Sequence, residues 1–362
     1  MFDKDKLMEV NGVGCVFNMP NAVSVRKDDE GNELPVGLPP HCQIKPYAVD
    51  EYPGCPDAWM HGSSKASSYF VPVKEDKGMW LDFNSCWNHK HDVAVVLSIQ
   101  GVNPISGQKQ DKMVLEQYRN KCPLHDCNFQ QDRFCPECKM TWPAQSYVST
   151  TGSSENHFWI DGFRNADGQV RQYIFSAEEM KGIAAQIIGK DRVFAIGIAF
   201  FLSKKPHGRI EAKTKSRSIV MDYSFPVQKL VKKSQFPNKY HTDETIVSCS
   251  ASDDYSMNSM LFDVGACEDE STSEEETRDY GEFRGMSIDK PVETKLEIGA
   301  GGLIDQQVDL DPKDPDYWEN EPVGFIYINY STQKEFDKIL AIGKRKEKKD
   351  GFMDGLKVGV RD

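Results

Sequence analysis

Two short cysteine-containing segments constrain the fold of this chain more than any other feature of its sequence. Cys122-Pro-Leu-His125 and Cys135-Pro-Glu-Cys138 share one design: a ligand-type residue, a proline, one further residue and a second ligand-type residue. This spacing lets both side chains of a segment point at one ion, and the proline lowers the backbone entropy lost on binding. Two such turns supply four ligands, the number that structural zinc prefers. Sulfur and imidazole favour zinc over magnesium or calcium.

The pair resembles the knuckles of zinc ribbons and rubredoxin-like folds. Met140-Thr-Trp-Pro143, just after the second segment, adds the aromatic and proline residues typical of that group. The resemblance is confined to residues 122–143, so it implies a zinc-binding loop inserted in a larger fold and gives no family for the whole chain. Cys127, two residues after His125, is an alternative fourth ligand. A set of thiols without metal is the remaining interpretation.

A metal held by Cys122, Cys135, Cys138 and either His125 or Cys127 has four protein ligands, which leaves no open position for a substrate. We therefore expect the ion to be structural. The start of the chain lacks an apolar signal segment, and a cysteine cluster among scattered single cysteines favours a reducing compartment, so we expect a cytoplasmic protein. The scattered cysteines are Cys15, Cys42, Cys55, Cys86, Cys249 and Cys267.

Composition places the chain among globular proteins. Apolar residues make up 39% and charged residues 28% of the 362 residues. The formal net charge of −12 disfavours nucleic acid as a partner, because phosphates would be repelled. The longest apolar run, Val193 to Leu202, is about half of what a membrane span requires, so we expect no membrane association.

Short apolar and aromatic runs bounded by turns predict an α+β, mainly β fold. We expect antiparallel sheets, a few short helices and the inserted zinc-binding loop. Helices are predicted over Asp111–Asn120, after the capping box Ser176–Glu179 to about Ile188, and after the capping box Thr332–Glu335 to Ile342. A hairpin is predicted around Arg164-Asn-Ala-Asp-Gly168. Strands are expected at 68–73, 93–99, 193–202, 219–225, 295–298 and 323–330.

We divide the chain into six regions by composition. A β-rich N-terminal region is followed by the zinc-knuckle insertion, a hairpin–helix–strand region, an acidic loop, a strand–helix region and a basic tail. The acidic and basic segments have opposite charge and could pair between subunits. The boundaries are 1–120, 121–145, 146–265, 266–285, 286–343 and 344–362.

His89-Lys-His91-Asp92 is a second candidate for metal chemistry. Alternation before the strand at Val93 places both imidazoles on one face, which suits a metal. The segment resembles the histidine-rich signature of metallo-β-lactamase-like hydrolases but lacks the residue before the aspartate and the histidine after it. The simpler interpretation is a polar entry to a strand.

Two other segments have a simple structural interpretation beside a functional one. Gly299-Ala-Gly-Gly302 could cradle a phosphate, but no Lys-Ser or Lys-Thr follows, so a bulge or close backbone contact is favoured. The acidic stretch Asp309–Asp316 could hold calcium, but it lacks the EF-hand spacing, so a solvated loop is favoured.

No catalytic motif is present in the sequence. We find no nucleophile elbow, phosphate loop or dinucleotide fingerprint. Our preferred hypothesis is a non-enzymatic structural protein that assembles with copies of itself. One alternative is a metal-dependent hydrolase that uses His89, His91 and a nearby acid such as Asp82. The other is an adaptor that binds a protein or nucleic acid through its zinc loop.

Overall fold

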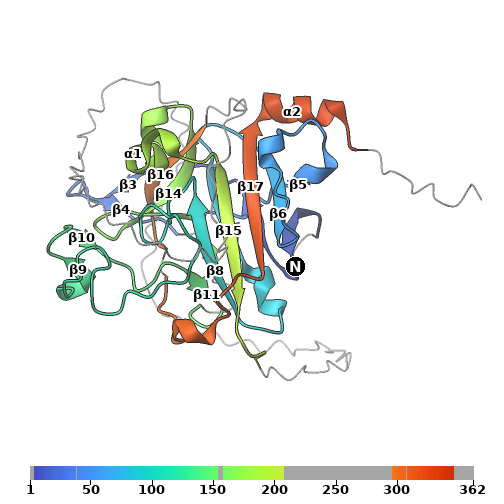
Figure 1. The fold of residues 1–362 in the computed structure, drawn as a ribbon. Coiled ribbons are helices and arrows are strands. Elements are labelled where there is room, and N and C mark those ends of the chain that lie inside the picture. The colour runs from blue at the N-terminus through green and yellow to red at the C-terminus, as the bar shows by residue number, and fades with distance from the viewer. Residues whose placement is uncertain (1–3, 38, 154–157, 208–295, 307, 346–362) are drawn as a thin grey trace, which may run out of the picture. The chain divides into compact units, whose positions relative to one another are not determined.

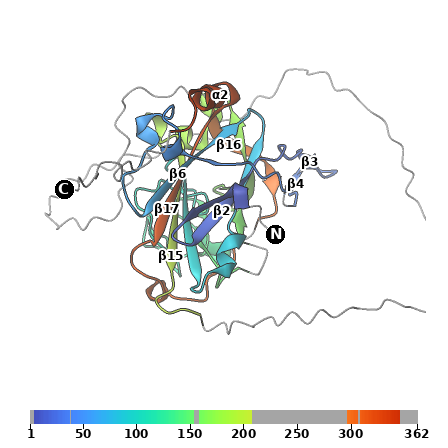
Figure 2. The same cartoon turned by 90° about the vertical axis from the view of Figure 1, so that its right-hand side faces the viewer.

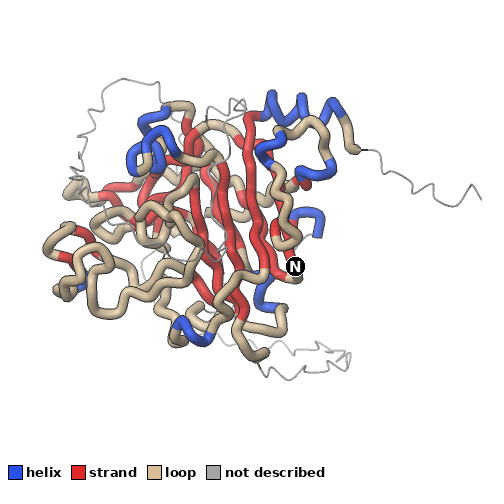
Figure 3. Tube along the Cα trace, viewed as in Figure 1, coloured by secondary structure: helices blue, strands red, loops and turns tan. Residues whose placement is uncertain are grey.

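The computed structural model describes residues 4–37, 39–153, 158–207, 296–306 and 308–345. All of them belong to one of the two compact units into which the chain divides, the unit formed by residues 1–209 and 278–362. This unit is built from strands joined by long loops, with few and short helices (Figures 1 and 3). The predicted α+β, mainly β fold is therefore confirmed.

The first sheet has six strands, and its neighbours are antiparallel except for β17 and β6, which are parallel. The predicted strands at 68–73, 93–99, 193–202 and 323–330 are all found in it. The central strands β8, β15 and β17 come from three different predicted regions of the chain, so these regions share one sheet. The order is β11 (Val148–Ser149), β8 (Val93–Ile99), β15 (Ala195–Leu202), β17 (Gly324–Thr332), β6 (Ala66–Val73), β5 (Tyr47–Ala48).

The second sheet has seven strands and includes the predicted hairpin, formed by β13 and β14. The glycine-rich segment Gly299–Gly302 lies inside β16, and the register of β14 against β16 shifts between Arg171 and Tyr173. The favoured interpretation of an irregular strand is confirmed. The path is β1 (Leu7–Val10), β2 (Val13–Asn18), β7 (Gly78–Asp82), β14 (Val170–Ser176), β13 (Gly162–Arg164), with β12 (Trp159–Ile160) on β7 and β16 (Glu297–Ile304) on β14.

The remaining elements are two short ribbons and small helices at the ends of the sheets (Figure 2). The ribbons are β3 (Arg26–Lys27) with β4 (Glu33–Leu34) and β9 (Phe134–Cys135) with β10 (Met140–Thr141). The α-helices are α1 (Ile183–Ile187) and α2 (Gln333–Ile342). The 3-10 turns are η1 (Lys4–Lys6), η2 (Val49–Glu51), η3 (Asp57–Trp59), η4 (Asn84–Asn88), η5 (Gln131–Arg133), η6 (Glu179–Lys181), η7 (Gly189–Asp191) and η8 (Pro315–Tyr317).

The main hydrophobic core lies between the two sheets. Val95 and Leu97 of β8 pack in the same cluster as Leu81 of β7 and Phe175 of β14. The intervening residues of β8 are also buried, because Trp318 and Tyr147 cover the other face of the first sheet. A strand buried on both faces reads as a continuous apolar run, which explains the pattern of 93–99.

The predicted helix at Asp111–Asn120 is wrong. The backbone of this segment instead hydrogen-bonds to residues 144–146, at the end of the knuckle segment (residues 118–146). Tyr118 N–H donates to Ala144 O at 2.8 Å, and Ser146 N–H donates to Glu116 O at 3.0 Å. Met113 is buried against the outer face of the first sheet. Long-range pairing thus replaces the local hydrogen bonds that a helix would require.

The capping box at Ser176–Glu179 also fails, whereas the second one is confirmed. Ser176 still belongs to β14 and pairs with Glu297, and only the short turn η6 and the five-residue α1 follow. Gly182 separates them, with φ −69° and ψ 126°. In contrast, Thr332 caps α2 by accepting from Glu335 N–H at 3.4 Å, and α2 ends at Gly343 with φ 83°.

Several predicted features lie outside the described residues: the strand at 219–225, the acidic loop 266–285 and the basic tail beyond Arg345. At the start of that tail, Lys344 pairs with Glu51 at 2.6 Å. Within the part of the chain that the structure describes, none of the helices has the length and apolar character to span a bilayer.

In the second sheet, the carboxyl group of Asp161 is buried, and one of its oxygens is unpaired among the described residues. Asp161, which follows β12, is 1% exposed, and its Oδ1 has no hydrogen-bond partner among the described residues. The hydroxyl of Tyr173 is likewise buried without a partner. Burial, with a smaller contribution from Asp305, raises the pKa of Asp161 to about 7. Between about pH 4 and pH 7, Asp161 is therefore protonated in the folded protein and ionised in the unfolded chain.

We expect Asp161 to lower the free energy of unfolding of the protein as the pH rises. Because the folded-state pKa lies above the unfolded one, the contribution of Asp161 is fully present below about pH 4 and is lost as the pH rises through about 7. The difference in unfolding free energy between wild type and Asp161→Asn should change by about 4 kcal/mol over this range, on the order of 1.4 kcal/mol per pKa unit. Urea unfolding at a series of pH values checks this. Asp305→Asn removes only the smaller contribution to the raised pKa of Asp161, so it should change the pH dependence of stability much less than Asp161→Asn does. A difference between wild type and Asp161→Asn that does not vary with pH would contradict the prediction.

Candidate metal centre

The two cysteine segments fold into turns of the same conformation. In the first, Asp126 N–H donates to Cys122 O at 2.9 Å, and in the second, Lys139 N–H donates to Cys135 O at 3.0 Å. Asp126 and Lys139, each directly after the second ligand-type residue, have positive φ values of 51° and 57°. This repeated geometry brings the paired side chains of each turn to one side of the backbone, as the spacing predicts.

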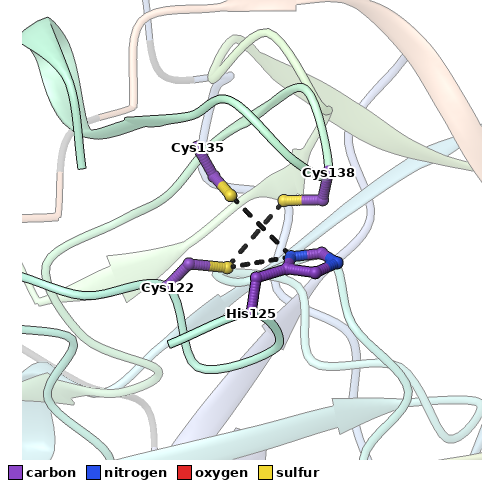
Figure 4. Close-up of side chains that lie close together, drawn as sticks. All are labelled: Cys122, His125, Cys135 and Cys138. Atoms are coloured by element: carbon purple, nitrogen blue, oxygen red, sulfur yellow. Dashed lines mark hydrogen bonds between the residues drawn. The ribbon is translucent and has the colours of Figure 1, made fainter. Parts of the chain in front are cut away.

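Four side chains from the two turns converge, as Figure 4 shows. The sulfur and nitrogen atoms of Cys122, His125, Cys135 and Cys138 all lie within 4.8 Å of one another. Cys122 Sγ is 3.6 Å from His125 Nδ1 and 3.9 Å from Cys138 Sγ, and Cys135 Sγ is 3.8 Å from His125 Nδ1. A tetrahedral zinc ion with Zn–S of about 2.3 Å and Zn–N of about 2.0 Å requires ligand separations of roughly 3.5–3.8 Å. The cluster fits that ion with little rearrangement.

The thiols of the cluster are buried, which makes several thiolates together costly without a cation. Cys122 is 1% exposed and Cys135 is 0% exposed. Burial raises the pKa of Cys122 to about 12. Burial also opposes ionisation of Cys135, but hydrogen bonds from Cys138 and Cys127 lower its pKa to about 6. Cys135 therefore forms a thiolate readily, whereas ionisation of Cys122 requires a nearby positive charge.

The structure places Cys127 beside the group of four. Its sulfur lies 3.4 Å from Cys135 Sγ, but it is not among the atoms that lie mutually within 4.8 Å. His125, in contrast, is within 4 Å of both Cys122 and Cys135. Of the two alternatives for the fourth ligand, the geometry favours His125.

A small aromatic core and one arginine support the cluster. Tyr118 and Trp142 pack with Cys122 and Cys135, and the Trp142 indole N–H donates to Cys138 Sγ at 3.4 Å. Arg133 donates to four backbone carbonyls, on both the segment that enters the knuckles and the segment that leaves them. These acceptors are the carbonyls of Tyr118, Arg119, Trp142 and Pro143. The ends of the loop are thereby tied together.

The knuckle segment is attached to the second sheet and to the loop before η8. Thr141 N–H donates to Ala166 O, in the turn of the β13–β14 hairpin, at 2.8 Å. Arg119 pairs with Asp314. In Figure 1, β9 and β10 lie on the opposite side of the first sheet from α2. The insertion is therefore fixed to the β framework at several points.

The carboxylate that anchors the loop before η8 is Asp311, one member of the acidic stretch 309–316. It is 3% exposed and accepts hydrogen bonds from Tyr147, Thr151, Trp318 and the backbone of Lys313. Asp311 is a buried structural residue, and the expected solvated loop is wrong at this position. Two of its partners, Tyr147 and Thr151, are about 160 residues away in sequence, so no local pattern could have identified its burial.

The candidate hydrolase residues do not form a second cluster. His89 Nδ1 accepts from His91 N–H at 3.2 Å, and His91 Nδ1 lies 2.7 Å from Ser203 O. Asp82 is 2% exposed and accepts from Asn84 N–H at 2.8 Å. Both imidazoles are thus engaged with the backbone. Among the described residues, the four-residue knuckle group is the single place where three or more ligand-type side chains come within metal-binding distance.

Comparison with models of known families, with curated proteins and with solved structures finds no match to this chain. Its function is therefore argued from the site alone.

Proposed function

We propose that Cys122, His125, Cys135 and Cys138 bind one zinc ion and that the ion is structural. The observation that carries this proposal is that the four ligand atoms lie within 4.8 Å of one another and that three of their separations, 3.6–3.9 Å, are close to the edges of a zinc tetrahedron. Three sulfurs and one imidazole suit zinc. Four protein ligands, two of them fully buried, leave no coordination position for water or substrate.

The proposed role of the ion is to hold a segment that has little other structure. Between Tyr118 and Ser146, the regular elements are η5 and the two-residue strands β9 and β10. The core of this segment contains four buried residues, Tyr118, Cys122, Cys135 and Trp142, two of which are ligands themselves. So small a core supplies little stability, and a bound ion would supply the rest.

We further propose that the protein is non-enzymatic and assembles with copies of itself. Support comes from the corner formed by η6, α1 and the turn before β15, where three large apolar side chains are exposed. These are Met180, Ile187 and Phe194, at 79%, 45% and 39% exposure. A second copy that covers these side chains would remove apolar area from water. The eight free cysteines of the described residues fit a reducing compartment, which we take to be the cytoplasm.

Native mass spectrometry combined with elemental analysis tests both parts of the proposal. For protein purified under reducing conditions, we expect zinc at a ratio near one per chain and masses at multiples of the 41.0 kDa chain. Material that folds and carries no zinc would refute the metal assignment. A species that remains a monomer at micromolar concentration would refute self-assembly.

A further inference from the structure

A cavity of about 240 Å³ lies between the knuckle segment and the β13–β14 hairpin. The knuckle segment contributes Trp142 and Arg133 to its lining, and the second sheet contributes Gly162, Arg164 and Val170. Half of the lining residues have large apolar side chains: Pro104, Ile105, Trp142, Pro143, Val170 and Val308. An apolar enclosure with a few polar groups is the usual composition of a small-molecule site.

One of the polar groups in this cavity is an arginine without an acceptor. The Nε of Arg164 is buried, and it has no hydrogen-bond partner among the described residues. No carboxylate of those residues lies within 4.0 Å of its guanidinium group. Burial and the charge of Arg133 lower the pKa of Arg164. A guanidinium held in this setting is a positive charge in need of a counter-ion.

The other half-buried arginines of the described residues are all satisfied. Arg171 pairs with Glu33 at 2.9 Å, and Arg192 pairs with Glu297 at 2.6 Å. Each of the three nitrogens of Arg133 has at least one carbonyl acceptor. Arg164 thus differs from the other arginines that line this cavity or are half-buried, because its buried Nε has no acceptor among the described residues.

A second side chain with a donor group, Gln306, lines the same cavity. The side-chain oxygen of Gln306 accepts from the backbone N–H groups of Asp161 and Gly162, at 2.7 and 3.2 Å. These two hydrogen bonds fix the side-chain amide of Gln306. Its amide nitrogen has no hydrogen-bond partner among the described residues and remains free to donate. Gln306 and Arg164 both line the cavity.

The charge balance of the lining limits the class of ligand. The planar guanidinium group of Arg164 matches the geometry of a carboxylate, which it can bind with two parallel hydrogen bonds. Asp132, an exposed acid that also lines the cavity, would repel a dianion such as phosphate. The volume equals that of about eight waters, so the ligand body is restricted to roughly ten non-hydrogen atoms. The apolar walls favour a hydrocarbon body.

We propose that this cavity is a binding site for a small apolar monocarboxylate, whose carboxylate pairs with Arg164 and whose body packs against Trp142 and Ile105. One wall of the site is formed by the knuckle segment, so the proposed zinc ion would hold that wall in position. The site itself is argued from the cavity and from Arg164, and it does not depend on self-assembly.

Isothermal titration calorimetry of the full chain with sodium benzoate and sodium phenylacetate tests the proposal. We expect saturable binding of at least one of them, and no binding of benzyl alcohol or inorganic phosphate under the same conditions. Arg164→Gln should weaken binding by about tenfold or more, as loss of a buried charge partner does. Ala144→Met, which fills the cavity while retaining Arg164, should also abolish binding.

Arg26→Gln, in β3, provides the matched control, since Arg26 is exposed and lies outside the cavity lining. Its affinity should equal that of the wild type. Circular dichroism and zinc content show whether each variant retains the fold. The proposal is overturned if neither carboxylate binds folded, zinc-loaded wild type, if benzyl alcohol or phosphate binds equally well, or if folded Arg164→Gln and Ala144→Met bind as the wild type does.

Discussion

Cys135→Ser should yield a protein that has lost its zinc and whose knuckle segment is unfolded, while the β framework around it persists. Cys135 is fully buried, and its sulfur lies beside both the His125 imidazole and the Cys127 thiol. Serine is a much poorer ligand for zinc than a thiolate. Structural zinc sites of this kind supply roughly 10–16 kcal/mol of apparent binding free energy, which is folding free energy for the segment that they hold.

Hydrogen exchange followed by mass spectrometry measures this effect segment by segment. In Cys135→Ser, amides between 121 and 142 should lose protection, whereas those of β8 and β15 should keep it. The framework has its own large core between the sheets and does not depend on the four buried residues of the knuckle segment. Wild type treated with a strong chelator should behave as the variant does. Full protection of residues 121–142 after complete removal of zinc would contradict a structural role for the ion.

Cys127→Ser is the matched control, because it changes a neighbouring thiol that the geometry leaves out of the ligand set. We expect it to retain zinc at the wild-type ratio, and we expect His125→Ala to lose zinc. The reverse outcome would show that Cys127 is the fourth ligand. Elemental analysis of the two purified variants distinguishes these results.

The second large effect is expected at the buried ion pair between β16 and the turn before β15. The side chains of Glu297 and Arg192 are 4% and 7% exposed, and their closest oxygen and nitrogen atoms are 2.6 Å apart. Gln100 also donates to Glu297, at 3.3 Å. Glu297→Ala leaves the Arg192 charge buried beside a cavity. Removal of one partner of such a pair costs about 3–5 kcal/mol.

The same arginine offers an internal control for this prediction. Arg192 also pairs with Glu179 at 2.8 Å, but the side chain of Glu179 is 67% exposed. Water screens that contact, so Glu179→Ala should cost less than about 1 kcal/mol. Urea unfolding of both variants at pH 7 gives the comparison. Equal destabilisation by the two substitutions would show that burial of the Glu297–Arg192 pair has little energetic consequence.

The sequence predicted those features whose geometry is local. The knuckle turns, the β13–β14 hairpin and the capped helix α2 each depend on residues within a few positions of one another. Backbone preferences and short-range hydrogen bonds determine such features before any tertiary contact forms. The apolar strands β8 and β15 were predictable for a related reason, because both of their faces are buried.

Where local preference competed with long-range contacts, prediction failed. The segment 111–120 has helical character but pairs with residues 144–146, and Ser176 extends β14 through Glu297 in place of capping a helix. In both places, hydrogen bonds to a distant strand or loop satisfy the same backbone groups.

The sequence by itself determined that two proline-containing turns would each present a pair of ligand-type side chains, since that spacing acts within four residues. Only the tertiary structure decided which side chains complete the group and which charges are buried. It placed His125 rather than Cys127 within metal-binding distance of the other three cysteine sulfurs and paired Glu297 with Arg192. It also left the Nε of Arg164 beside a cavity with no acceptor among the described residues. These outcomes depend on distances between residues far apart in the chain. Such distances exist only once the two sheets have packed, because the energy of a charge or a donor depends on what surrounds it there.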